Sequence, residues 1–171
     1  LAQEMSDQPK FRQDYYATAF GEGWGLYAER IAGEAGIYRT PYERFGALSY
    51  EMWRACRLVA DTGLHWYGWT RSAAEACFIE NSALAPLNIQ TEVTRYIGWP
   101  GQAVAYKVGE LKIRELRARA EASLGDSFDV REFHDALLAE GAVPLDVMEA
   151  RIDDWIAAQH STASNTDTLA D

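Results

Sequence analysis

The sequence predicts an all-α protein, because helix signals recur along the chain while strand signals are nearly missing. It contains no Asn-Gly or Asp-Gly pair to mark a tight hairpin, and no sustained run in which β-branched residues alternate with polar ones. Apolar residues instead recur every three or four positions, often after a capping residue or a proline. With 171 residues, 48% of them hydrophobic, the chain is long enough to bury the core of a single helical bundle.

Seven helices are predicted, over residues 10–35, 41–61, 70–79, 88–97, 102–124, 129–141 and 144–159. The first follows Pro9, carries apolar and aromatic residues three or four positions apart, and stops at Gly36. The second begins at Thr40-Pro41-Tyr42-Glu43, which supplies an N-cap, a proline at the first helical position and a capping-box glutamate. We expect this helix to end before Gly63.

The next three helices are marked mainly by what flanks them. Thr70 is a cap for the third helix and Asn88 for the fourth. Pro100 precedes the fifth and longest of the three, in which apolar residues are interspersed with Arg and Lys, as in an amphipathic helix. Gly125 closes it.

The last two helices begin at the capping-box pair of Asp129 with Glu132 and at Pro144. The tail, residues 160–171, is rich in Ser, Thr, Asn and Asp and has few large apolar residues, so it is predicted to be disordered. The sequence therefore predicts one helical domain over residues 1–159, followed by this tail.

Composition restricts the partners and the compartment. The formal net charge of −10 and a pI near 4.8 argue against a nucleic acid or an anionic lipid, because both would repel the chain. No apolar run approaches the roughly 18 residues of a transmembrane helix. Cys56 and Cys77 each fall inside a predicted helix, so neither a disulfide framework nor a thiolate zinc site is signalled, and the compartment is left open.

Three stretches depart from an ordinary helix-bundle sequence, and the first is residues 20–29. Its three glycines cost roughly 1 kcal/mol each relative to alanine inside a helix, so another element should approach this backbone closely. Glu22 and Glu29 are seven positions apart and share a helix face. A carboxylate presented in this way suits a buried metal or catalytic site. The alternative is tight helix packing over the glycines, with both glutamates exposed.

The second stretch, residues 61–70, is a predicted turn in which aromatic residues surround His65 and Asp61 could fix the histidine tautomer. It indicates either a pocket wall or part of an ordinary core. The third, residues 92–107, is a helix broken at Gly-Trp-Pro-Gly and restarted. Its tyrosines and Arg95 could bind a substrate carboxylate or an oxyanion, or the break could be a kink held by stacked aromatics.

These stretches together resemble the carboxy-terminal half of the bacterial domain of unknown function 885 family, over residues 1–159. The similar segments are EGWGLYAE at 22–29, RLVADTGLH at 57–65 with GWT at 68–70, and RY at 95–96 with WPGQAVAYK at 99–107. The resemblance implies that the helical bundle is the C-terminal part of a larger gluzincin-like zinc peptidase. It also implies that Glu22 is a zinc ligand beside the two histidines of an HExxH motif.

That motif is missing from the sequence. The only histidines are His65, His134 and His160, and no two are four positions apart, so one helix face cannot present two imidazoles. We therefore expect the motif to lie shortly before Leu1, in a missing N-terminal half of the same protein or in a separate chain. Alone, the chain is expected to be inactive.

With that half supplied, the resemblance implies zinc-dependent hydrolysis of a peptide substrate. The expected oxyanion-stabilising groups are Tyr96, Tyr106 and His65, with Asp61 orienting His65. The expected substrate-binding residues are Arg95, Gln102, Lys107, Trp24 and Trp69. Among the three candidates for the oxyanion, Tyr96 is favoured. This segment resembles that of the angiotensin-converting-enzyme-like carboxydipeptidases, in which an Arg-Tyr pair in a late helix lines the site.

Two other functions are left open. One is a non-catalytic scaffold, a pseudo-peptidase that binds peptides or another protein without cleaving them, and the other is a regulatory bundle in which the glycines serve only packing. Relatives are often periplasmic or lipid-anchored, but a cytoplasmic location is also possible. A half-domain should expose an apolar face for its partner, expected around Trp24, Tyr27, His65, Trp69 and Tyr96.

Overall fold

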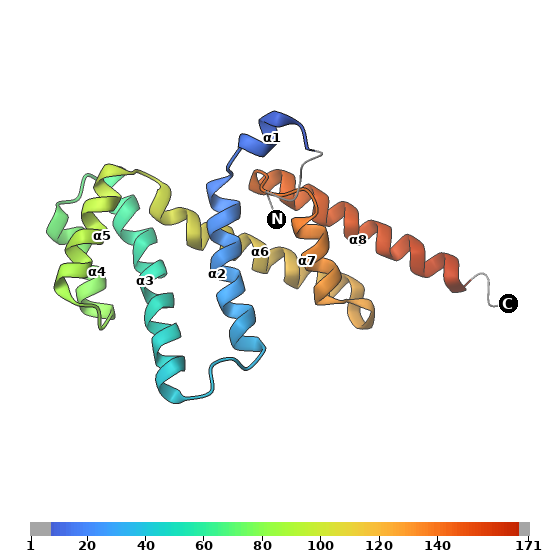
Figure 1. Cartoon of the computed structure of the whole chain (residues 1–171), viewed down its shortest axis with the longest axis horizontal. Helices are drawn as coiled ribbons and strands as arrows, with labels where there is room; N and C mark the ends of the chain where they lie inside the picture. Colours follow the sequence, from blue (N-terminus) through green and yellow to red (C-terminus); the bar gives the residue numbers. More distant parts are fainter. Residues whose placement is uncertain (1–7, 168–171) are drawn as a thin grey trace. The chain divides into compact units, whose positions relative to one another are not determined.

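The computed structural model describes residues 8–167, and within this range it contains helices and no strand, which confirms the all-α prediction (Figure 1). The elements are α1 (Lys10–Asp14), α2 (Thr18–Glu34), α3 (Pro41–His65), α4 (Arg71–Asn81), α5 (Pro86–Gly98), α6 (Gln102–Leu124), the short 3-10 helix η2 (Gly125–Ser127), α7 (Val130–Leu138) and α8 (Leu145–Asp167). No helix of the described range is both long and apolar enough to span a bilayer.

The helix predicted for residues 10–35 is interrupted near its start. Tyr15 has an extended backbone, with φ −80° and ψ 126°, so α1 ends before it and α2 begins at Thr18. The break places the ring of Tyr16 over Gly21, where an added Cβ would lie 2.6 Å from the hydroxyl oxygen of that tyrosine. One of the three glycines in the first unusual stretch is thus explained by the packing of a ring.

Helix α3 begins as predicted but ends later. Both bonds of the capping box are present, since the N–H of Glu43 donates to Thr40 Oγ1 at 3.2 Å and the N–H of Thr40 donates to Glu43 Oε2 at 2.8 Å. The helix then continues through Gly63 to His65. Gly63 is tolerated there because the ring of Trp69 covers it, and a Cβ at this position would lie 2.2 Å from that ring.

The end of α8 also differs from the prediction, because the helix passes Gln159 and continues to Asp167. Extending an existing helix adds one hydrogen bond per residue without a new nucleation step, so a polar stretch of modest helix propensity can continue it. Residues 160–167 are thus assigned to α8, residues 168–171 lie outside the described range, and the predicted disorder of the tail stays a prediction.

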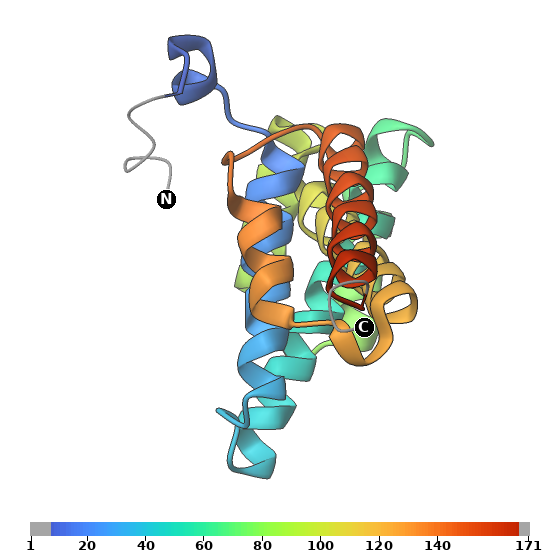
Figure 2. The same ribbon diagram turned by 90° about the vertical axis from the view of Figure 1, so that its right-hand side faces the viewer.

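The chain divides into two compact units, and the boundaries fall inside α2 and α6. The central unit is Glu22–Glu110, and the terminal unit takes the residues before Glu22 and after Glu110. In the terminal unit α7 packs against α8 (Figure 2). Phe133 of α7 is fully buried there and meets Trp155 edge-on, with 6.2 Å between the ring centroids.

The core of the central unit lies between α3, α4 and α5. It is formed by buried side chains from these helices and the start of α6, namely Trp53, Cys56, Ala60, Ala74, Phe78, Ile89, Val93, Tyr96 and Ala103. Phe78 is its aromatic centre, with ring centroids 6.2 Å from Trp53 and 6.0 Å from Tyr96. This core holds α5, and with it Tyr96, in a fixed position relative to α3.

A disulfide joins Cys56 of α3 to Cys77 of α4, with 5.7 Å between their Cα atoms. The sequence signalled no disulfide because neither cysteine belongs to a recognisable spacing pattern. The bond forms because α3 and α4 are packed neighbours and each presents its cysteine to the other, which only the tertiary structure shows.

Candidate functional site

Helix α2 crosses α6 at a glycine on each side. A Cβ at Gly23 would lie 2.5 Å from the Cα and carbonyl carbon of Gly109 and 2.8 Å from the backbone N of Glu110, so only glycine permits this approach. Gly25, by contrast, has open space where its side chain would be. The tight packing over glycine that the sequence left as an alternative is therefore present, but it also brings Glu22 to the first turn of α6.

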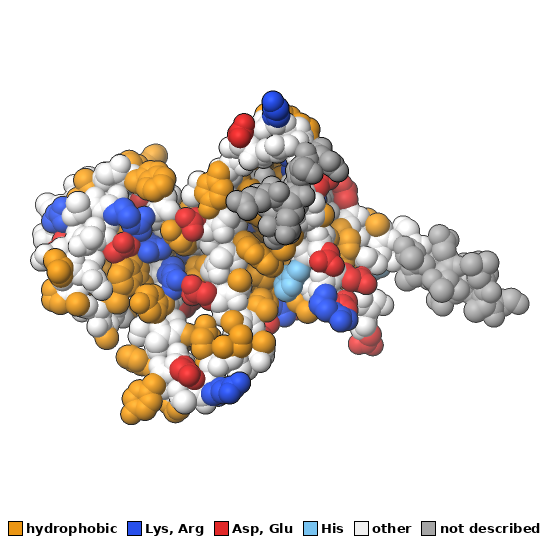
Figure 3. All heavy atoms as spheres, viewed as in Figure 1, with side chains coloured by type: hydrophobic (Ala, Val, Ile, Leu, Met, Phe, Trp, Pro, Cys, Tyr) orange, Lys and Arg blue, Asp and Glu red, His pale blue; other side chains and the backbone are white. Residues whose placement is uncertain are grey.

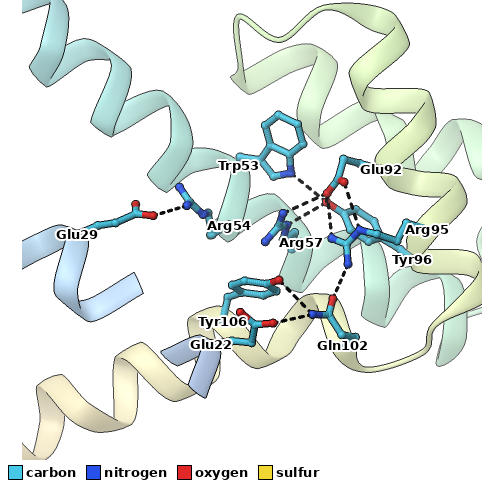
Figure 4. A network of polar contacts seen from close by, with 10 residues as sticks. All are labelled: Glu22, Glu29, Trp53, Arg54, Arg57, Glu92, Arg95, Tyr96, Gln102 and Tyr106. Atoms are coloured by element: carbon cyan, nitrogen blue, oxygen red, sulfur yellow. Dashed lines mark hydrogen bonds and ion pairs between the residues drawn. The ribbon is translucent and has the colours of Figure 1, made fainter. Parts of the chain in front are cut away.

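The carboxylate of Glu22 is half-buried and is held by Gln102 (Figure 4). Gln102 Nε2 donates to Glu22 Oε1 at 3.1 Å and to the hydroxyl oxygen of Tyr106 at 3.1 Å. Gln102 Oε1 accepts from Arg95 Nη1 at 2.5 Å. Within residues 8–167 the second oxygen of Glu22 makes no hydrogen bond or ion pair, and the hydroxyl proton of Tyr106 has no acceptor.

A second part of the network surrounds the hydroxyl of Tyr96, which is buried. It accepts from Trp53 Nε1 at 2.9 Å and from Arg57 Nε at 3.0 Å, and it donates to Glu92 Oε2 at 2.8 Å. A phenol has one proton and two lone pairs, so this hydroxyl is fully used inside the protein. Burial raises the pKa of the Tyr96 phenol, and the charge of Arg57 opposes that rise.

Glu92 is the acceptor at the centre of this network. Arg95 donates to both of its oxygens, at 3.2 and 2.9 Å, and Arg57 Nη2 donates to Oε2 at 3.1 Å. Burial works to raise the pKa of Glu92, but the hydrogen bonds from Arg95 and Tyr96 and the two guanidinium charges outweigh it and leave the pKa below its ordinary value. Glu92 is therefore ionised at neutral pH.

Arg95 and Lys107, the two cationic side chains that the sequence assigned to substrate binding, both have partners in the chain. Arg95 is bound to Glu92 and Gln102. Lys107, which is buried, pairs with Glu51 and with Glu110, the latter at 3.1 Å. The sequence assigned Arg95, Gln102 and Lys107 to the carboxylate of a peptide substrate, and each would have to exchange an internal partner to bind one. Those roles stay predictions.

His65 is at the last position of α3, with Nε2 2.9 Å from the backbone oxygen of Tyr96. The prediction that Asp61 orients His65 is wrong. Both carboxylate oxygens of Asp61 instead accept from the N–H of Gly101, each at 3.2 Å, because the buried Asp61 side chain faces the turn between α5 and α6. Asp61 therefore fixes the Gly-Trp-Pro-Gly turn, and His65 caps the carbonyl at its start.

Trp24 and Trp69 both keep part of their surface exposed. Trp24 is half-buried on α2, with its ring centroid 5.7 Å from that of Tyr27. Trp69 lies over Gly63 and keeps 41% of its surface exposed. Their role as substrate-binding residues stays a prediction.

The face expected to be exposed for a partner is only partly exposed: Tyr27 and Tyr96 are 0% and 1% exposed, whereas Trp69 is 41% exposed. The Tyr96 ring is instead covered by the aromatic core around Phe78.

Sequence reasoning missed the two residues that organise the network, Glu92 and Arg57. A signal for Glu92 exists, since Glu92, Arg95 and Tyr96 are three and four positions apart and so share a helix face. Arg57 is far away in sequence and reaches this face only because α3 packs on α5. Its guanidinium also lies over the ring of Tyr106, 4.4 Å from the ring centroid, and so links both parts of the network.

The described residues do not form a metal site alone, since none of their His, Cys, Asp and Glu side chains gather in a group of three or more that could hold an ion. Protein zinc sites use three or four protein ligands. Glu22 offers one available carboxylate oxygen, which fits a single ligand position and no more.

Comparison with known proteins identifies the family. No curated protein matches the chain. The crystal structure of "the putative lipoprotein from Colwellia psychrerythraea" is 42% identical in sequence, covers 92% of this chain and superposes with a TM-score of 0.89. This chain spans 27% of the length of that protein. The model of the family described as "Bacterial protein of unknown function (DUF885)" matches residues 1–152, and the chain belongs to this family.

Proposed function

We propose that this chain supplies part of the active site of a peptidase, with Glu22 as a metal ligand and Tyr106 as a hydroxyl donor to the substrate. The observation that supports the proposal is the Glu22–Gln102–Tyr106 cluster. Gln102 fixes one carboxylate oxygen and the phenol oxygen, while the other carboxylate oxygen and the phenol proton have no partner among the described residues. In the proposed site, the available carboxylate oxygen binds the metal and the phenol proton points to the oxyanion.

The metal in this proposal is zinc, and its other ligands would come from outside the described residues. Bound zinc polarises the scissile carbonyl and lowers the pKa of a bound water. The part of this chain is limited to one carboxylate, because Glu22 has no second ligand beside it within the described residues.

Tyr106 suits the oxyanion better than Tyr96 does. An oxyanion is stabilised by a preorganised donor whose proton is free to point at it. The proton of Tyr96 is donated to Glu92, whereas Tyr106 only accepts, from Gln102. The guanidinium of Arg57 over the ring of Tyr106 holds that ring in place and adds positive charge close to it.

The proposed compartment is outside the cytoplasm. The disulfide between Cys56 and Cys77 supports it, because disulfides persist in oxidising environments. The similar crystal structure is described as that of a putative lipoprotein, which also favours a lipid-anchored or periplasmic protein. A peptide substrate would then be met in that compartment.

The test compares the zinc affinity of the complete gene product with that of two variants. Glu22→Gln should weaken zinc binding by roughly two orders of magnitude or more, because it removes a ligand rather than a supporting hydrogen bond. Glu29→Gln is the matched control. Glu29 lies seven positions further along α2 and is paired with Arg54 at 2.6 Å, so its loss should leave zinc binding unchanged. Equal zinc affinity in the Glu22→Gln variant and the wild type would exclude the metal role.

A non-catalytic peptide-binding scaffold is the second candidate. The observation in its favour is that the Tyr96 hydroxyl and the charges of Arg57, Arg95 and Lys107 are all satisfied inside the chain. A complete gene product that binds peptides but holds less than one zinc per molecule would support the scaffold and reject the peptidase.

A further inference from the structure

The first half of α3 is a long helical stretch without a core. Residues 41–52 include no buried residue, and the buried residues of α3 begin only at Trp53. Helices in proteins gain most of their stability from packing one face against other elements. The capping box of Thr40 and Glu43 fixes the first turn but buries nothing. Three turns of helix are therefore presented without a single buried side chain.

This half of α3 also begins an exposed apolar stripe, which consists of Phe45, Leu48, Met52 and Val59. Their exposed fractions are 62%, 67%, 40% and 44%. The intervals of three, four and seven positions put all four on one narrow face, over about 21 Å of helix. In the space-filling view, hydrophobic side chains gather over the end of the molecule where α3 begins (Figure 3).

A stripe with these intervals is suited to one helix lying along it. The intervals are those of the a and d positions of a helix–helix seam, which is narrower than the apolar face of a helix that lies on a broad core. Side chains at such positions insert between those of a single facing helix. The expected occupant is therefore a helix with its own apolar stripe.

We propose that the α3 stripe is the docking surface for a helix of the same polypeptide that lies outside these 171 residues. The similar crystal structure supports this choice of occupant. It contains this fold with a TM-score of 0.89, yet this chain spans only 27% of its length, so most of that polypeptide lies outside the matched fold. This docking surface does not depend on the proposed peptidase function, because it involves neither Glu22 nor the network around Tyr96.

The experiment places a photo-cross-linking amino acid, p-benzoylphenylalanine, at position 48 of the complete gene product. Leu87 is the matched control, because it is a leucine on α5 that is 72% exposed and lies outside the stripe. After irradiation, mass spectrometry should find a cross-link from position 48 to a segment of the same polypeptide outside residues 1–171. A cross-link to a second copy, or a yield no higher than that of the position 87 control, would overturn the proposal.

Amide hydrogen exchange gives a second measurement that does not need the modified residue. In the complete gene product, the amides of residues 45–52 should exchange at least roughly tenfold more slowly than in the variant Leu48→Glu with Met52→Glu. Leu87→Glu should leave the exchange of these amides unchanged. Equally fast exchange in the wild type and the double variant would show that nothing covers the stripe. Neither measurement uses zinc or a substrate, so a failure here would leave the proposed function untouched.

Discussion

Loss of the disulfide between Cys56 and Cys77 should destabilise the central unit by an amount set by the loop that it closes. The two cysteines are 21 positions apart. In the chain-entropy treatment, a loop of this length contributes about 3 kcal/mol at 25 °C, because the cross-link restricts the unfolded chain. Both sulfur atoms lie in or beside the aromatic core, so their replacement also removes packed volume.

Reduction separates the cross-link from the packing, because it changes no side-chain volume. Urea unfolding of the wild type, followed by tryptophan fluorescence, to which the buried Trp53 contributes, should show a free energy of unfolding about 3 kcal/mol lower with a phosphine reductant than without it. The variant Cys56→Ala with Cys77→Ala is the control, and its unfolding should not respond to the reductant.

Two outcomes would refute this reasoning. The first is a thiol titration of the unfolded, non-reduced protein that finds two free thiols, since the bond would then not exist. The second is a wild-type transition that keeps its midpoint in the presence of reductant, although the thiols become free. In that case α3 and α4 are held together by the core around Phe78 alone, and the unfolded chain retains structure that already keeps the two cysteines close.

Three further predictions concern the helix crossing and the network. Gly23→Ala should destabilise the protein by about 1–3 kcal/mol through a clash with the backbone of α6, whereas Gly25→Ala should be neutral or stabilise it by up to about 1 kcal/mol, as measured by urea unfolding. The pKa of Glu92 is lowered in the folded state, so the contribution of Glu92 to stability is complete above the unfolded pKa near 4.5 and is lost as the pH falls through the lower folded pKa. In a plot of the free energy of unfolding against pH, Glu92→Gln should therefore reduce the fall on the acid side. An acid-side fall as steep as that of the wild type would contradict the prediction. Tyr96→Phe should lower the free energy of unfolding by about 1–3 kcal/mol because it leaves buried partners unpaired, while Tyr106→Phe should lower it by less than about 1 kcal/mol. If the proposed peptidase function holds, Tyr106→Phe should slow peptide hydrolysis more than Tyr96→Phe does, and the opposite order of the two rates would assign the donor role to Tyr96.

The fold could be predicted from the sequence where local signals decide it. Such signals act over a few residues. They include the capping box at Thr40 with Glu43 and the helix ends at Gly36 and Gly125, and the structure contains all of them. The late end of α3 could not be predicted, because Gly63 continues the helix only with the ring of Trp69 against it. That contact depends on the turn after α3, which the local sequence does not determine.

The candidate site was predictable as a group of residues but not as a set of roles. Glu22, Gln102 and Tyr106 do come together, as the close approach at Gly23 required. The choice between the two tyrosines depends on which hydroxyl is already used, and Arg57, from a separate helix, makes part of that difference. Sequence spacing carries no information about a partner that reaches the site through tertiary packing.

The order of the hydrogen bonds keeps the guanidinium of Arg95 from binding the Glu22 carboxylate directly. A guanidinium bound directly to the Glu22 carboxylate would occupy its oxygens and compete with a cation for them. Instead, Arg95 binds the oxygen of Gln102, and the neutral amide of Gln102 passes only a hydrogen bond to Glu22. The charge of Arg95 is balanced by Glu92, on the far side from Glu22. Gln102 therefore orients the carboxylate through a neutral amide, and a positively charged side chain in place of Gln102 should abolish the proposed cation binding at Glu22 even if the fold is unchanged.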